Sequence, residues 1–284
     1  MRIANSGGRL TLMGMDDRGI DVETTSRGRF AADPQAIYAH WRDFRRWAGD
    51  LRDRCGDWPI VESELGAPSP MPAQVFAIGL NYKAHAAEAG LAVPSTPAVF
   101  TKFPTCITGP VADVALPSSK VDWEVELVVV IGTRAYRVSE SDAWNHVAGL
   151  TVGQDLSERV VQWAGAGQFS LGKSFPGFGP MGPWLVTPDE IPNHDDLELG
   201  STIDGETVQK SRTSDMVFSV SRLIAELSAV LPLLPGDVIF TGTPAGIGAT
   251  RNPPRFLKPG EVLSSFIEGI GTLRNRLVAT RPES

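Results

Sequence analysis

Residues 121–131 read V-D-W-E-V-E-L-V-V-V-I, and this stretch predicts the centre of the fold. Its apolar residues alternate with Asp122, Glu124 and Glu126, which is the period-two pattern of a β-strand. Because successive side chains of a strand point to opposite faces, we expect the three acids on one face. Residues 127–131 are apolar on both faces, so the strand is expected to enter a buried core.

Carboxylates at the edge of a core repel each other and lose hydration unless a cation lies between them. A further acid, Asp155, lies in a second apolar run at residues 149–157. Carboxylates at the ends of two core strands can converge on a hard cation, so we predict that Glu124, Glu126 and Asp155 bind Mg²⁺, with Mn²⁺ or Ca²⁺ as alternatives. The sequence has no neighbouring cysteines or paired histidines here, which disfavours zinc. A solvated strand face is the alternative interpretation of the two glutamates alone.

The composition is that of an ordinary globular protein and limits its partners. The 284 residues are 42% hydrophobic and 21% charged, and the net charge of −7 gives no sign of a nucleic-acid surface. The longest aliphatic run, residues 127–131, is too short to span a membrane. Cys55 and Cys106 form no disulfide framework, and the N-terminus has no apolar segment of the signal-peptide kind. We therefore expect a soluble cytoplasmic protein.

The 29 glycines and 22 prolines indicate many turns and strands, so we predict a mixed, β-rich α+β fold. Asp33 and Pro34 predict the start of a helix, whose buried stripe comprises Ile37, Trp41, Phe44, Trp47 and Leu51. The Pro-rich residues 66–72 form the best candidate linker. We therefore predict a small N-terminal α+β domain at residues 1–70 and a larger domain at residues 71–284.

Further elements follow from local patterns. We predict a helix around residues 139–147 and an amphipathic helix at residues 219–231. Residues 197–203 and 206–210 predict a β-hairpin with an Asp-Gly turn. Residues 169–183 are too rich in Gly and Pro for a regular element, and loops of this kind often carry function.

Two polar pairs lie at helical spacing. His85 and Glu88 are three apart in a short helix predicted at residues 81–90, where the carboxylate would orient the imidazole and raise its basicity as a general base. An ordinary surface ion pair is the alternative interpretation. Arg159 and Gln162 are also three apart, on a predicted helical turn.

Three other polar residues stand out by their surroundings. Lys173 is the only charge in residues 169–183, and Lys102 is an isolated cation between aromatic residues. Thr243 lies in the glycine loop of residues 241–248, which lacks the Lys-Ser/Thr of a P-loop and the G-x-G-x-x-G spacing. We therefore expect this loop to approach a carboxylate-bearing ligand rather than a nucleotide.

Eight pieces of the sequence together resemble the fumarylacetoacetate hydrolase (FAH) superfamily, in its bacterial branch of short two-domain members. They occur in the family's order over roughly residues 79–275, and they are G-L-N-Y-K-A-H-A-A-E, F-T-K-F-P, V-D-W-E-V-E-L, Q-D-L-S-E-R-V-V-Q, L-G-K-S-F-P, I-D-G-E-T-V-Q, P-G-D-V-I-F-T-G-T-P-A-G-I-G and E-G-I-G-T-L-R-N. The chain departs from the family at Val160, where an acid is common, and at Cys106, where a small hydroxyl residue is common.

The resemblance implies a C-terminal domain built as a β-roll of mixed, largely antiparallel sheets, which normally forms a homodimer. It also implies roles for the residues selected above. These are a Mg²⁺ or Mn²⁺ site at Glu124, Glu126 and Asp155, a His85 and Glu88 pair on a mobile lid, a substrate-side Lys173, oxyanion contacts from Arg159 and Gln162, and a substrate contact from Thr243. We assign Lys102, within the matching F-T-K-F-P, as a further candidate substrate contact.

These residues predict a metal-dependent hydrolase that cleaves a carbon–carbon bond in an acylpyruvate-like 1,3-diketo acid, of the fumarylacetoacetate or fumarylpyruvate class. The 2-oxo acid end would chelate the metal, His85 would activate water, and Lys173 would stabilise the leaving enolate. Isomerisation of a 2-hydroxyhepta-2,4-diene-1,7-dioate or decarboxylation of oxaloacetate would pass through the same enolate, so both remain open. A third hypothesis is a metal-stabilised binding protein without turnover.

Overall fold

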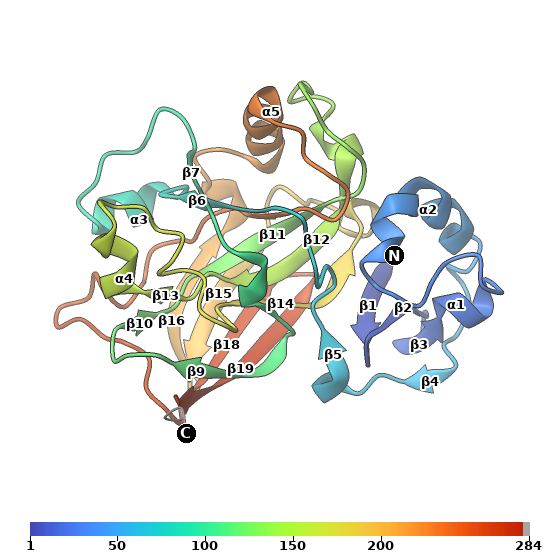
Figure 1. Cartoon of the computed structure of the whole chain (residues 1–284), viewed down its shortest axis with the longest axis horizontal. Coiled ribbons are helices and arrows are strands. Elements are labelled where there is room, and N and C mark those ends of the chain that lie inside the picture. Colours follow the sequence, from blue (N-terminus) through green and yellow to red (C-terminus); the bar gives the residue numbers. More distant parts are fainter. Residues whose placement is uncertain (281–284) are drawn as a thin grey trace.

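The computed structural model describes residues 1–280, and its architecture is two main β-sheets and one two-stranded sheet, with short helices around them (Figure 1). The helices are α1 (Val22–Thr25), α2 (Trp41–Gly49), α3 (Lys83–Glu88), α4 (Arg159–Ala164) and α5 (Val220–Val230). The strands are β1 (Arg2–Ser6), β2 (Arg9–Met13), β3 (Arg18–Asp21), β4 (Trp58–Pro59), β5 (Leu65–Gly66), β6 (Val75–Gly79), β7 (Ala98–Thr101), β8 (Ile107–Thr108), β9 (Val111–Leu116), β10 (Val121–Asp122), β11 (Val125–Ile131), β12 (Val147–Gln154), β13 (Ser157–Glu158), β14 (Gly179–Val186), β15 (Glu198–Ile203), β16 (Glu206–Arg212), β17 (Val238–Phe240), β18 (Val262–Ile267) and β19 (Gly271–Ala279).

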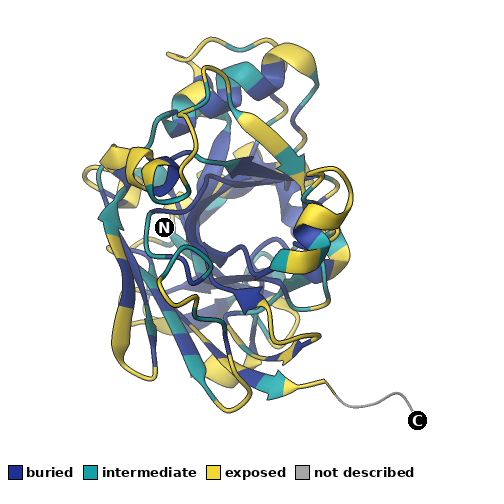
Figure 2. Cartoon of the chain, turned by 90° about the vertical axis from the view of Figure 1, so that its left-hand side faces the viewer, coloured by how far each residue is buried: buried dark blue, intermediate teal, exposed yellow. Residues whose placement is uncertain are grey.

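The two sheets confirm the predicted β-rich α+β fold and enclose a common core. The large sheet has the order β4-β3-β2-β1-β14-β12-β11-β17-β6-β7, and the small one has the order β16-β15-β18-β19-β9. One cluster of buried apolar side chains contains Leu127 and Leu150 of the large sheet, Leu199 and Ile267 of the small sheet, and Leu223 of α5. Figure 2 shows buried strands gathered around the interior of this roll, with exposed segments on its outside.

The acidic strand forms as predicted but is interrupted. All seven residues of β11 are buried, which confirms the two-sided burial of residues 127–131. The expected single strand is broken at residues 123–124, because β10 leaves the large sheet and pairs with β13. At the break, the Gln154 side chain accepts from the Glu124 backbone N–H at 2.8 Å and donates to the hydroxyls of Ser201 and Ser265 in the small sheet. The interruption therefore separates Asp122 from the other two acids.

The N-terminal segment extends the large sheet. β1 pairs antiparallel with β14, and Ile3 lies opposite Leu185. Trp41 of α2 belongs to the same buried cluster as Val128 and Val130 of β11. The Pro-rich stretch packs closely against this joint, because the buried Ser69 hydroxyl donates to the Gly236 carbonyl at 2.7 Å. The predicted division at residue 70 stays a prediction, and a continuous sheet and a shared core cross it.

Two predicted helices are shorter than expected. The helix predicted from Asp33 begins only at Trp41, after a 3-10 helix at Ala36–His40. Asp33 accepts from the Gln35 N–H at 2.9 Å, so its side chain closes a turn instead of capping an α-helix. The helix predicted at residues 139–147 was wrong apart from a 3-10 helix at Ala143–His146, because β12 begins at Val147.

The prediction of an irregular segment at residues 169–183 was wrong at its end. β14 begins at Gly179 and lies between β1 and β12 in the large sheet. The ladder there is irregular, and the Thr151 hydroxyl donates to the Gly182 carbonyl at 3.0 Å where the β12 register shifts. Sheet pairing thus overrides a composition that disfavours strands.

The predicted hairpin and amphipathic helix are both confirmed. β15 and β16 pair across Asp204 and Gly205, whose φ angles of 49° and 86° suit an Asp-Gly turn. α5 begins after Ser219, whose hydroxyl accepts from the Arg222 N–H. Within residues 1–280, no helix has the length and apolar character needed to cross a membrane.

Candidate active site

The three predicted metal ligands meet at one edge of the large sheet. Glu124 lies in the break before β11, Glu126 is in β11, and Asp155 directly follows β12. The antiparallel ladder ends with Val125 opposite Gln154, and just beyond it the Asp155 N–H donates to the Glu124 carbonyl at 2.9 Å. One carboxylate oxygen from each acid lies within 4.8 Å of the others, and all three side chains are buried.

Cationic side chains surround two of these acids. The Lys173 ammonium contacts Glu124 Oε2 at 2.8 Å and Asp155 Oδ2 at 2.6 Å. Arg159 contacts Glu124 Oε1 at 2.7 Å. Burial by itself would raise the pKa of Glu124, but the positive charges of Lys173 and Arg159 outweigh it and lower the pKa to about 2. Glu124 is therefore ionised at neutral pH.

Glu126 differs from its two neighbours. Its carboxylate accepts from the Gly242 N–H at 2.7 Å, and among residues 1–280 no cationic side chain forms an ion pair with it. Burial and the negative charges of Asp155 and Glu124 hold the pKa of Glu126 well above its ordinary value. A divalent cation among the three acids would supply the missing positive charge, and an all-oxygen donor set suits Mg²⁺ or Mn²⁺. The residues present therefore fit the predicted metal.

The structure brings His85 and Glu88 together on α3. His85 Nδ1 lies 2.8 Å from Glu88 Oε1, and the other Glu88 oxygen accepts from the Gly246 N–H at 2.9 Å. Burial would raise the pKa of Glu88, but the hydrogen bonds from His85 and Gly246 lower it overall. The carboxylate thus fixes the ring and leaves Nε2 for other partners.

Arg159 and Gln162 lie on consecutive turns of the short helix α4. Arg159 donates to Gln162 Oε1 at 2.9 Å, so the amide nitrogen of Gln162 is left as a donor. Two further nitrogens of the guanidinium donate to Asp122 Oδ2, at 2.9 and 2.7 Å. Asp122 is thus a buried anchor for Arg159, and sequence analysis assigned it no role.

A cavity of about 340 Å³ opens beside the acids. Its lining includes six of the predicted site residues, which are His85, Glu124, Arg159, Gln162, Lys173 and Thr243. The Thr243 hydroxyl donates to the Val125 carbonyl and accepts from Gln209. Glu88, Glu126 and Asp155 contact lining residues or lie beside them without lining the cavity themselves.

Lys102 does not line this cavity. Its ammonium donates to Asp155 Oδ1 at 2.7 Å and to the Lys173 carbonyl, and the side chain is fully buried. The prediction of a substrate contact gains no support from this position. The contacts favour a different role, in which Lys102 lies outside the cavity lining and holds Asp155 in place.

The remaining wall of the cavity is apolar, and sequence analysis did not anticipate it. Phe100 of β7, Phe169 and Trp163 of α4 form a chain of edge-to-face contacts, with ring centroids 5.6 Å and 4.8 Å apart. Lys173 lies over the Phe100 ring, 5.3 Å from its centroid. Trp163 is one position from Gln162, which was the only sequence signal that could have drawn attention to it.

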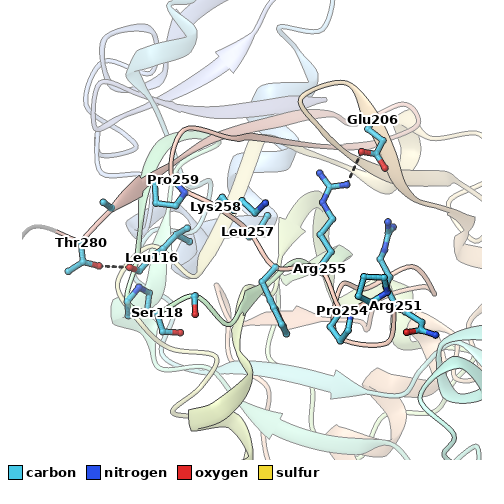
Figure 3. A pocket seen from close by; sticks show the side chains of 16 residues that line it. Leu116, Ser118, Glu206, Arg251, Pro254, Arg255, Leu257, Lys258, Pro259 and Thr280 are labelled. Atoms are coloured by element: carbon cyan, nitrogen blue, oxygen red, sulfur yellow. Dashed lines mark hydrogen bonds and ion pairs between the residues drawn. The ribbon is translucent and has the colours of Figure 1, made fainter.

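A larger hollow of about 1110 Å³ lies elsewhere, along the segment of residues 251–259 (Figure 3). Its lining contains no histidine, and its one acid, Glu206, pairs with Arg255 at 2.8 Å. Arg251 donates to the backbone carbonyls of Val208 and Gly246. The lining of this hollow contains none of the ten predicted site residues, whereas six of them line the smaller cavity, which is therefore the candidate active site.

Comparisons with known proteins show which family the chain is similar to. The sequence model described as fumarylacetoacetate (FAA) hydrolase C-terminal matches residues 74–278. A provisionally named HpcE protein from Mycobacterium smegmatis has a similar structure, with a TM-score of 0.94 and 53% identity over 99% of this chain and 100% of that one.

Two further similar structures are of proteins whose names state an enzymatic reaction. The 2-hydroxyhepta-2,4-diene-1,7-dioate isomerase from Mycobacterium marinum has a TM-score of 0.67 and 38% identity, over 76% of this chain and 78% of that one. The maleylpyruvate hydrolase from Sphingobium sp. SYK-6, in complex with manganese(II) and pyruvate, has a TM-score of 0.80 and 27% identity, over 99% and 100%.

Proposed function

This chain belongs to the fumarylacetoacetate hydrolase family, and on that premise we propose that it is a divalent-metal-dependent hydrolase that cleaves a carbon–carbon bond in an acylpyruvate-like 1,3-diketo acid. One observation carries the proposal: the imidazole of His85, bound to Glu88, and the carboxylate of Glu124 line the same cavity of about 340 Å³. One substrate could therefore meet both a metal site and an oriented base.

The metal, when bound, supplies Lewis acidity at the 2-oxo acid end of the substrate. The side chains supply the proton transfers. His85 Nε2 takes a proton from a water molecule, whose oxygen attacks the distal carbonyl carbon. The carbon–carbon bond then breaks, so that the acyl group leaves as a carboxylate and pyruvate leaves as an enolate that takes up a proton.

Three cavity residues stabilise the negative charges that develop. The Arg159 guanidinium and the free amide of Gln162 are suited to the oxyanion on the attacked carbonyl. The Lys173 ammonium has two of its three donors on Glu124 and Asp155, and the third remains for the enolate. A Lys173→Met variant with full turnover would contradict this assignment.

An isomerase is the second candidate, and the name of the Mycobacterium marinum relative favours it. Isomerisation of a dienoate, like decarboxylation of oxaloacetate, needs the metal site and Lys173 but no attacking water. The two classes therefore differ in their need for His85. The homodimer and the cytoplasmic location stay predictions, and light scattering of the purified protein would test the former.

The first experiment is a titration of metal-stripped protein with Mg²⁺ and Mn²⁺, with and without oxalate or pyruvate, followed by melting temperature. We expect a stabilisation that needs both metal and oxalate, of about 2.7 kcal/mol at a hundredfold excess over Kd. Acetylpyruvate and oxaloacetate would then be assayed as substrates. If neither metal nor oxalate moves the melting temperature, and Glu124→Ala behaves as the wild type, a protein without turnover becomes the leading hypothesis.

A further inference from the structure

We infer that the acyl arm of the substrate is apolar, of the aryl or long alkyl kind, and carries no second carboxylate. The inference rests on the proposed function and narrows its substrate class to 2,4-diketo acids with a hydrophobic end. It is carried by how charge and apolar surface are distributed around the candidate active site.

The charges of the cavity gather at one end. Among the described residues that line it, the ionisable ones are His85, Glu124, Arg159 and Lys173. Glu124 contacts Arg159 at 2.7 Å and Lys173 at 2.8 Å, so these three form one cluster beside the acids. The 2-oxo acid end of a substrate therefore belongs at this end of the cavity.

The two cations of the cavity are already matched by acids. Lys173 lies between Glu124 and Asp155, and Arg159 lies between Glu124 and Asp122. A carboxylate on an arm that lies inside the cavity, against the apolar lining, would lose hydration without gaining an unpaired cation, which is unfavourable. A dioate substrate would face this cost, whereas an uncharged arm would not.

Much of the remaining lining offers apolar contact instead. This part consists of aliphatic and aromatic side chains, which are Ile78, Leu80, Leu91, Phe100, Trp163, Phe169 and Ile247. Leu91 and Trp163 stay 48% and 55% exposed, although they are large and apolar. An apolar arm would cover both side chains and gain free energy from the buried area.

The aromatic chain also fixes where the arm would lie. Phe100 contacts the Lys173 ammonium at one end, and Phe169 joins Phe100 to Trp163 at the mouth. The wall thus runs from the charged cluster outward. A ligand that extends from the metal ligands along this side of the cavity would contact these rings.

The test measures the binding of three 2-oxo acids to the Mg²⁺-loaded protein by calorimetry. Pyruvate has no arm, phenylpyruvate has an aryl arm, and 2-oxoglutarate has a carboxylate arm. We expect phenylpyruvate to bind at least about tenfold more tightly than pyruvate, and 2-oxoglutarate no more tightly than pyruvate. If pyruvate binds but phenylpyruvate gains nothing over it, or 2-oxoglutarate binds most tightly, the inference is overturned and the proposed function stands. If none of the three binds, the proposed function fails, and the inference fails with it.

Two variants of Trp163 test whether this side chain accounts for the higher affinity for phenylpyruvate. Trp163→Ala should bring the affinity for phenylpyruvate close to that for pyruvate and leave pyruvate unaffected. Trp163→Arg adds a cation at the mouth and should make 2-oxoglutarate the tighter ligand. Val160→Ala, on the same helix and 63% exposed but outside the cavity lining, is the matched control and should change neither affinity. Equal losses in Trp163→Ala and Val160→Ala would overturn the inference.

Discussion

Asp122 binds the guanidinium of Arg159 and a glycine loop at the same time. Its Oδ2 accepts from Arg159 Nε at 2.9 Å and from Nη2 at 2.7 Å, while its two oxygens also accept from the N–H groups of Gly248 and Ala249. Both Arg159 and Ala249 line the candidate active site. One buried carboxylate therefore sets the position of two walls of the cavity.

Replacing Asp122 should impair turnover more than ligand binding. We expect Asp122→Asn to lower kcat about 10²–10³-fold, because Arg159 loses the anion that orients it toward the oxyanion. The affinity for Mg²⁺ should stay the same, since the three acids are unchanged. The free energy of unfolding should fall by about 3–5 kcal/mol, the usual cost of breaking a buried ion pair.

Asp113→Asn is the control for this change. Like Asp122, Asp113 pairs with an arginine, Arg276, but both of these side chains are exposed. The same chemical substitution there should leave turnover and melting temperature unchanged. Equal effects at the two positions would mean that Asp122 has no special relation to the site.

His85 separates the hydrolase from the other enolate chemistries. We expect His85→Ala to slow acylpyruvate hydrolysis by about 10²–10⁴-fold, because the water loses its base. Decarboxylation of oxaloacetate by the same variant should change far less, because no water attacks. Steady-state rates with both substrates measure this difference, and a parallel loss of both activities would argue against water activation by His85.

The ionised carboxylate of Glu88 should contribute to folding stability at neutral pH and lose that contribution in acid. Its folded pKa is lowered from the ordinary value of 4.5, so its charge stabilises the folded state above that pH. This contribution is lost as the pH falls through the folded pKa. Urea denaturation should therefore find Glu88→Gln less stable than wild type at pH 7, with a difference that shrinks as the pH falls below 4.5. A difference that stays constant with pH would show that another interaction is responsible.

Relative to wild type, the Glu126→Gln substitution should raise the melting temperature of metal-free protein and lower the stabilisation that metal provides. In metal-free protein, Glu126→Gln removes a buried carboxyl group whose ionisation beside Glu124 and Asp155 is unfavourable, and its side-chain oxygen can still accept from the Gly242 N–H. We expect a higher melting temperature without metal and no further rise when Mg²⁺ and oxalate are added. Thermal melts of both proteins over one Mg²⁺ series test this, and a normal metal-dependent rise in the variant would exclude Glu126 as a ligand.

Lys102 distinguishes a substrate contact from a support for the metal site. Because its ammonium is buried against Asp155, we expect Lys102→Met to lower the free energy of unfolding by about 3–5 kcal/mol. If Lys102 touched substrate instead, KM would rise and the melting temperature would stay unchanged. Measuring both quantities on one preparation decides between the two roles.

Sequence analysis predicted the parts of the site that depend on local order. Glu124 and Glu126 stand out because strand alternation places them together, and His85 and Glu88 because helical spacing does. The role of Asp122 depends on the break before β11, where β10 turns to pair with β13. That break is stabilised by contacts of Gln154 with the small sheet, which lie far away in the sequence.

The position of Lys102 could not be predicted for a similar reason. Its partners, Asp155 and the Lys173 carbonyl, are 53 and 71 positions away along the chain. Between two aromatic residues, a lysine can equally line a pocket or lie buried with an acid. Only the packing of separate segments decides which occurs, and no local pattern reports it.

β1 can pair with β14 only late in protein synthesis, because the two strands lie far apart in the sequence. The amino group of Met1 donates to the Thr187 hydroxyl at 2.6 Å, across 186 positions of sequence, and β1 pairs with β14 beside it. At translation rates of 5–20 residues per second, roughly 10–40 s separate the emergence of these two partners from the ribosome. During that time β1 has no β14 to pair with, so the β1–β3 segment cannot yet join the large sheet. The docking of β1–β3 therefore has to wait for a strand that is made much later, and the nascent protein has to protect the apolar side chains of that segment until β14 arrives.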